Sequence, residues 1–77
     1  MAGKIEAQKA LGRAVRDFRK QRELSQEALA DISGLHRTYV GGVERGERNP
    51  TYTSIVRLAE ALDVRPATLV DRADQLS

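Results

Sequence analysis

The fold is decided by the stretch Ser25–Gly46, SQEALADISGLHRTYVGGVERG, which places two short helical patterns on either side of one glycine. Ser25 is a suitable N-cap, because its side-chain oxygen can accept a hydrogen bond from the free amides that open a helix. Gly34 permits the left-handed backbone conformation that ends a helix sharply. The stretch therefore predicts a helix over 26–33, a tight turn and a second helix over 37–45.

Apolar residues recur at helical spacing on both sides of this stretch. Leu11, Val15 and Phe18 follow an i, i+4, i+7 pattern, and a stronger pattern covers 55–62. Pro66 is well placed in the first turn of a further helix. No segment alternates apolar and polar residues for long enough to predict a strand. We therefore expect an all-α chain of five helices, over 7–22, 26–33, 37–45, 52–62 and 66–73.

The composition fits one small domain over residues 1–77, with its core at 11–70. A chain of this length buries about 60% of its unfolded surface, so we expect a thin core and modest stability. The lack of cysteine leaves no disulfide and no thiolate zinc site, which fits a reducing cytoplasm. No apolar run approaches the ~20 residues of a membrane span, and 1–9 lacks the hydrophobic centre of a signal peptide.

The charge is divided along the chain. Residues 1–57 carry eleven Lys and Arg against seven Asp and Glu, a net +4, whereas 58–77 carry two against four, a net −2; the two sum to the chain's +2. A basic part of this kind suits a polyanion, and the acidic end suits a different contact. Charge alone also fits an ordinary solvated surface.

A short helix, a glycine turn and a second short helix form the helix-turn-helix layout. The sequence resembles the phage repressor/Cro-type (XRE) helix-turn-helix transcriptional regulators over about residues 11–70. Within that family, HRTYVGGVERGERN at 36–49 is most similar to the restriction–modification controller proteins. The resemblance implies a compact five-helix lambda-repressor-like DNA-binding domain, with 37–45 as the recognition helix. The segments that carry the resemblance are Val15–Arg19, Leu24–Ala30, Gly34–Gly46, Arg48–Thr51 and Leu58–Val64.

The sequence departs from the family pattern at several helix ends. Glu23 and Asp63 stand where glycines usually end helices, so we expect both residues to adopt positive φ at some cost. His36 and Arg65 replace the usual Ser or Thr caps. Two glycines inside the recognition helix each cost about 1 kcal/mol relative to alanine.

The start of the recognition helix is where helix-turn-helix proteins address base edges. Arg37 can donate two hydrogen bonds to guanine O6 and N7, a contact worth about 1–3 kcal/mol of discrimination. Thr38 can donate to a base or place its methyl group against thymine. We also expect base contacts at Gly41 and Gly42. For Arg37, a phosphate contact or a solvated position remains an alternative.

The resemblance implies DNA-backbone contacts on both sides of these residues. Gln26 resembles the family's phosphate-contacting glutamine, which can also brace the recognition helix, and its alternative is a surface residue that only supports the cap. Tyr39 is expected at phosphate or sugar, with half-buried packing as its alternative. His36 is the only histidine, so it cannot assemble a metal site or a catalytic triad alone. The expected DNA-backbone contacts are Gln26, His36, Tyr39, Arg45, Gly46, Arg48 and Asn49.

Two further sets of residues are expected to hold the protein together. Arg19 and Glu44 resemble the family's internal ion pair, which we interpret as structural because either charge, buried alone, would be costly. Grouped apolar residues toward the C-terminal end predict a homodimer interface. Its expected members are Tyr52, Val64, Leu69 and Val70.

These patterns predict a cytoplasmic, bacterial or phage-derived regulator. We expect it to bind double-stranded DNA as a homodimer, on a near-palindromic operator whose half-sites lie about one helical turn apart. We expect no cofactor, metal, membrane contact or small-molecule effector. Two other classes remain open: a protein-binding module on the same fold, such as an antitoxin or adaptor, and an enzyme, although no nucleophile–base pair is visible.

Overall fold

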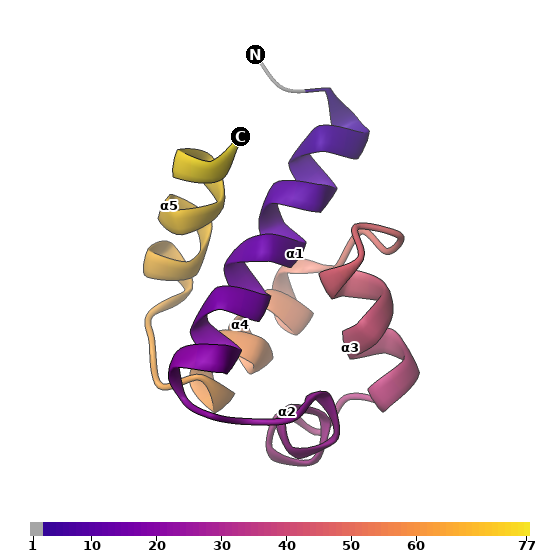
Figure 1. Cartoon of the computed structure of the whole chain (residues 1–77), viewed down its shortest axis with the longest axis vertical. Helices are drawn as coiled ribbons and strands as arrows, with labels where there is room; N and C mark the ends of the chain where they lie inside the picture. Colours follow the sequence, from indigo (N-terminus) through magenta and orange to yellow (C-terminus); the bar gives the residue numbers. More distant parts are fainter. Residues whose placement is uncertain (1–2) are drawn as a thin grey trace.

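Five helices account for most of residues 3–77, the part of the chain that the computed structural model describes (Figure 1). The all-α prediction and the five helices are confirmed. α1 begins three residues earlier than predicted, because the segment before Ala7 consists of residues that a helix accepts at little cost. α5 continues to Leu76, which packs against the core. The helices are α1 Lys4–Gln21, α2 Gln26–Ser33, α3 Arg37–Glu44, α4 Tyr52–Ala61 and α5 Pro66–Leu76.

α1 lies between α3 and α5 and contacts both of them (Figure 1). α2 packs against α3 and α4, and α4 packs against α5, so every helix buries one face in a shared core. The fully buried core residues are Ala14, Val15, Leu29, Val40, Val43, Leu58, Ala59, Leu62 and Leu69.

The turn between α2 and α3 forms as the sequence predicts. Ser25 Oγ accepts a hydrogen bond from the Ala28 amide at 2.9 Å and caps α2. Gly34 has φ +74°, in the left-handed region, and ends α2. The Leu35 amide then donates to the Ala30 carbonyl at 3.1 Å, which closes the turn. These local bonds fix the direction in which α3 leaves α2.

The departures from the family pattern affect the backbone angles and the caps at the helix ends. Glu23 and Asp63 have φ of +56° and +58°, as predicted for residues that stand in place of glycine. At Asp63 the carboxylate accepts a hydrogen bond from Arg22 Nη2 at 3.0 Å. His36 and Arg65 occupy the N-cap positions of α3 and α5 without a side-chain cap bond.

The prediction that Leu69 belongs to the dimer interface is wrong. Leu69 is fully buried and belongs to the core, so it is not available to a partner. Val64 is half-buried and packs against the same core. The exposed large apolar side chains near this end are instead Tyr52 and Val70, 73% and 48% exposed. Across the described residues, no helix combines the length and the apolar character needed to cross a membrane.

Candidate nucleic-acid interface

The inner face of α3 is fixed by close contact with α1. Val40 and Val43 are fully buried in the core. Gly12 of α1 faces the C-terminal carbonyls of α3, and a Cβ on Gly12 would lie 2.6 Å from the Glu44 carbonyl oxygen. No side chain fits there, so glycine allows the two helices to approach this closely. Sequence reasoning missed Gly12, whose only signal was a lone glycine inside a helical pattern.

A buried polar network holds the end of α3. Arg19 Nε and Nη2 donate to the two carboxylate oxygens of Glu44 at 2.6 and 2.9 Å, and Nη1 donates to the Leu24 carbonyl at 2.8 Å. The side chains of Arg19 and Glu44 are only 12% and 3% exposed. The hydrogen bond to Glu44 raises the pKa of Arg19, against the opposing effect of burial. The geometry of the expected ion pair is therefore present, and it links α1 to the end of α3.

Gln26 joins the same network. Its Nε2 donates to Glu44 Oε1 at 3.0 Å, so the carboxamide at the start of α2 is held beside α3. The side chain is half-buried, with its Oε1 turned toward Gly41. This placement matches the bracing role that the sequence suggested for Gln26.

The outward face of α3 presents a polar hollow of about 220 Å³. Arg37 and Thr38 at the start of the helix are exposed, whereas Gly41, one turn further on, is buried beneath the Arg45 and Gln26 side chains. The hollow is lined by Gln26, Arg37, Thr38, Gly41 and Arg45. The structure thus brings together residues that were predicted separately as base contacts and as backbone contacts.

Two of the expected DNA contacts, Gly42 and Gly46, are buried in this structure. Gly42 is buried, and a Cβ on it would meet Arg48 Cγ at 2.7 Å, so the Arg48 side chain covers it. Gly46 is buried against α1, where a Cβ would lie 2.9 Å from Lys9 Cα. The Gly46 amide already donates to the Val43 carbonyl at 3.0 Å. Both glycines serve close packing, and neither offers a free surface to DNA.

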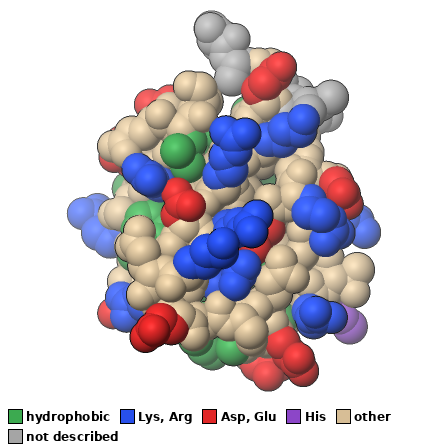
Figure 2. Space-filling view, viewed as in Figure 1, with side chains coloured by type: hydrophobic (Ala, Val, Ile, Leu, Met, Phe, Trp, Pro, Cys, Tyr) green, Lys and Arg blue, Asp and Glu red, His purple; other side chains and the backbone are tan. Residues whose placement is uncertain are grey.

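The remaining expected backbone contacts lie around the rim of α3. His36 precedes the helix and is exposed, and Arg48 and Asn49 are exposed in the loop after it. Tyr39 is half-buried and its ring packs against the core, which is the alternative stated above for this residue. Figure 2 shows Lys and Arg side chains over α1 and on the α3 side of the molecule, interspersed with Asp and Glu.

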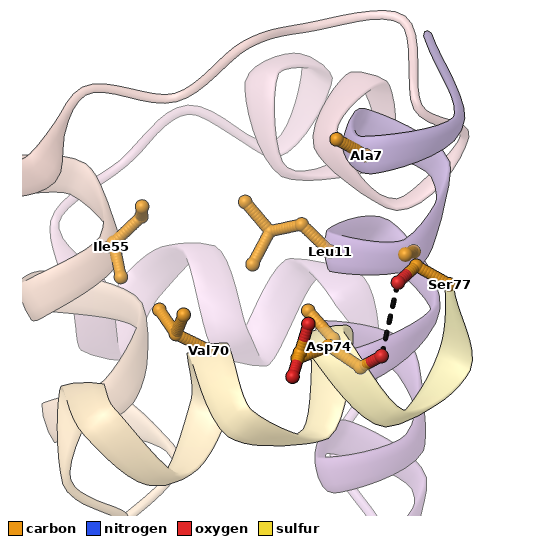
Figure 3. A pocket seen from close by; sticks show the side chains of 8 residues that line it. Ala7, Leu11, Ile55, Val70, Asp74 and Ser77 are labelled. Carbon is orange, nitrogen blue, oxygen red and sulfur yellow. Dashed lines mark hydrogen bonds between the residues drawn. The ribbon is translucent and has the colours of Figure 1, made fainter. Parts of the chain in front are cut away.

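A second feature lies on the other side of α1. Leu11, Ile55 and Val70 point from three different helices into an apolar groove of about 460 Å³ (Figure 3). Asp74 and Ser77 line one end of the groove. In Figure 1, α5 and α3 stand on opposite sides of α1, so this groove faces away from the polar hollow.

The chain is similar to known proteins along most of its length. A family model described as helix-turn-helix matches residues 15–69. Control protein C.SmaI of Serratia marcescens is 47% identical over 68 residues, 88% of this chain and 81% of that protein. Control protein C.BamHI of Bacillus amyloliquefaciens is 43% identical over 61 residues, 78% and 75% of the two chains. The crystal structure of the restriction-modification controller protein C.AhdI from Aeromonas hydrophila aligns with a TM-score of 0.79 at 50% identity, covering 80% of this chain and 94% of that chain.

Proposed function

Because the chain belongs to the helix-turn-helix family of transcriptional regulators, as its motifs indicated, we propose that it is a sequence-specific double-stranded DNA-binding regulator of the restriction–modification controller type. The observation that carries this proposal is the outward face of α3. There Arg37 and Thr38 are exposed, next to a polar hollow, on a helix whose opposite face is locked into the core. An α-helix fits the major groove of B-DNA, where each base pair shows a distinct hydrogen-bonding pattern.

The contacts divide by what each residue can reach. Arg37 and Thr38 are exposed on the outward face of α3 and address base edges, and the buried Gly41 leaves room there for the Arg45 side chain. Arg48 and Asn49 follow the helix and meet the phosphates beside the groove. Phosphate contacts position the protein but carry no sequence information, so specificity depends on the residues of α3. His36 before the helix, Tyr39 in its first turn and Gln26 at the start of α2 complete the backbone contacts.

We propose that the protein works as a homodimer through the α4–α5 side. Val70 is an exposed apolar side chain that lines the 460 Å³ groove, Tyr52 is exposed at the start of α4, and grouped exposed apolar residues mark interfaces. Pairing on this side leaves α3 free in both copies, since α1 separates the two faces. A two-fold dimer matches a near-palindromic operator.

The proposed mechanism is binding at an operator, with no reaction catalysed. The relatives carry names of control proteins, so gene control in the cytoplasm is the role that we propose for this chain. Specific binding raises the local occupancy of one DNA site, and the position of that site relative to a promoter decides whether transcription rises or falls.

The test is selection of bound duplexes from a random pool, followed by titration of the selected operator. We expect two half-sites about 10 base pairs apart and affinity that falls steeply with salt. Inserting about 5 base pairs rotates one half-site to the opposite face of the duplex, so it should abolish tight binding. Selection of no motif, or affinity that ignores salt, would overturn the proposal.

Sedimentation tests the dimer separately. Val70→Glu should give monomers, because a charge enters the proposed interface without entering the core. Ile32→Glu is the matched control, since Ile32 is 59% exposed on α2, away from the groove, and should leave the dimer intact. A Val70→Glu variant that dimerises as well as the original protein would refute the α4–α5 interface.

A further inference from the structure

Arg45 does not extend freely from the end of α3. Its Nε donates to Glu47 Oε2 at 3.1 Å, and this bond turns the other end of the guanidinium toward Gly41. A Cβ on Gly41 would lie 3.0 Å from Arg45 Nη1 and 3.4 Å from Gln26 Oε1. The Arg45 guanidinium therefore overhangs the hollow, in a space that is open because residue 41 has no side chain.

The Arg45–Glu47 pair contributes little to stability. The two side chains are 56% and 61% exposed, and exposed ion pairs are screened by water. The bond nevertheless restricts the orientation of the guanidinium, since it occupies Nε and leaves the two terminal nitrogens as donors. Two parallel donors match the O6 and N7 acceptors on the major-groove edge of guanine.

Arg37 and Arg45 stand at opposite ends of the hollow. They are eight residues apart, which corresponds to about 12 Å along a helix axis. At this separation the two guanidiniums address different base pairs. Gly41 lies between them, one turn from each, and is buried beneath the Arg45 guanidinium.

We propose that Arg45, positioned by Glu47 over Gly41, reads a second guanine in each half-site, so that the hollow is a base-edge subsite rather than a phosphate contact. This inference rests on the proposed function, because it deepens the account of the same face of α3. It assigns Glu47 a positioning role: the carboxylate orients Arg45 and touches no base itself.

Arg45→Lys separates base reading from phosphate binding. Lysine keeps the positive charge but loses the planar pair of donors. We expect selection with Arg45→Lys to lose the guanine preference at one position of each half-site, by about five- to a hundred-fold. The preference that depends on Arg37 should remain. Replacing that guanine with 7-deazaguanine, which lacks the N7 acceptor, should weaken the original protein more than it weakens Arg45→Lys, because a single ammonium can still reach guanine O6.

Glu47→Ala removes the acceptor of Arg45 Nε together with the charge, and it tests the positioning role with a readout that a general charge effect does not reproduce. Removing a negative charge near DNA should strengthen binding to random duplexes. It should also reduce the guanine preference at the Arg45 position, because the guanidinium is no longer oriented. Stronger binding with an unchanged preference would contradict the positioning role.

Gly41→Ala and Gly42→Ala form a matched pair inside α3. Both exchanges favour the helix, and Gly41→Ala should not lower the melting temperature because the new methyl group meets only the ends of Arg45 and Gln26. The alanine at 41 displaces Arg45 and narrows the hollow, and we expect weaker operator binding with loss of the same guanine preference. The alanine at 42 meets the flexible side chain of Arg48 and should keep that preference.

The outcomes distinguish the inference from the function on which it rests. If the original protein selects no motif, the proposed function itself fails. If the original protein selects a motif, and Arg45→Lys and Gly41→Ala both select the same motif, the proposed function stands and the guanine subsite is wrong. A uniform loss across all sequences in Arg45→Lys would assign Arg45 to phosphate and also overturn the subsite.

Discussion

The two faces of α3 differ in how much room each leaves. On the inner face, Gly12 of α1 sits against the carbonyls of α3 so closely that a Cβ has no space. On the outer face, Gly41 opens a hollow of about 220 Å³ whose rim is made of flexible side chains. Glycine serves both faces: one glycine fixes the helix in place, and the other leaves its reading surface open.

This difference separates stability from recognition. The inner face carries the core valines and the network of Arg19, Glu44 and Gln26, whereas the outer face carries the exposed Arg37 and Thr38. A helix held rigidly pays less to order itself on binding, so more of the contact energy remains for discrimination. Substitutions on the inner face should therefore change the free energy of unfolding. Substitutions on the outer face should change the preference for particular base pairs.

The largest expected effect comes from Arg19→Ala. It removes the partner of Glu44, whose side chain is 3% exposed, and leaves a buried carboxylate without its ion pair. We expect a loss of about 3–5 kcal/mol in the free energy of unfolding, measured from denaturant midpoints.

The double variant Arg19→Met, Glu44→Leu is the control for this prediction. It removes both charges and fills the site with apolar atoms, so it should cost less than Arg19→Ala alone. If Arg19→Ala is close to neutral, the pair contributes nothing and α3 is held by packing alone.

The next effect is expected at Gly12. In Gly12→Ala the new methyl group meets backbone oxygens that cannot swing aside, so α1 and α3 must separate. Overpacking of this kind costs about 1–3 kcal/mol. Thermal unfolding should show a lower midpoint for Gly12→Ala and an unlowered midpoint for Gly41→Ala, although both variants exchange glycine for alanine within a helix. Equal midpoints would mean that the two faces do not differ as described.

Much of this contrast was predictable from the sequence. The N-cap at Ser25, the turn at Gly34 and the positive φ of Glu23 follow from local chemistry, which needs no knowledge of distant residues. The pairing of Arg19 with Glu44 came from the family resemblance. The outward position of Arg37 followed from its place at the start of the recognition helix.

The residues that were missed depend on which way a side chain points in three dimensions. In α5, one residue corresponds to about 100° of rotation, so Leu69 lies in the core while Val70 faces outward. Gly42, inside α3, and Gly46, just after it, were expected at DNA, but the Arg48 side chain covers Gly42 and Lys9 of α1 covers Gly46. Gly12 gave no sign of its contact, because its partner carbonyls lie more than thirty residues away.

On the outer face, Arg37→Ala should alter recognition without altering stability. The side chain is exposed, so the free energy of unfolding should stay within about 0.5 kcal/mol of the original. Loss of two hydrogen bonds to guanine should relax the preference at one base position by about 1–3 kcal/mol. Binding to a set of single-base operator variants measures this, and a profile parallel to that of the original protein would remove base reading from Arg37.

The smallest change in specificity is expected for Arg48→Ala. Arg48 is exposed after the end of α3, and its side chain covers Gly42, so it lies beside the reading surface rather than on it. If Arg48 neutralises one phosphate, its loss should weaken all sequences nearly evenly and lower the slope of log affinity against log salt by about one. Arg48→Lys, which keeps the charge, should largely restore both quantities. Titration of one operator and one random duplex at several salt concentrations separates the outcomes. A loss confined to particular base positions would place Arg48 in a groove, and the outer face of α3 would then share its reading role with the loop.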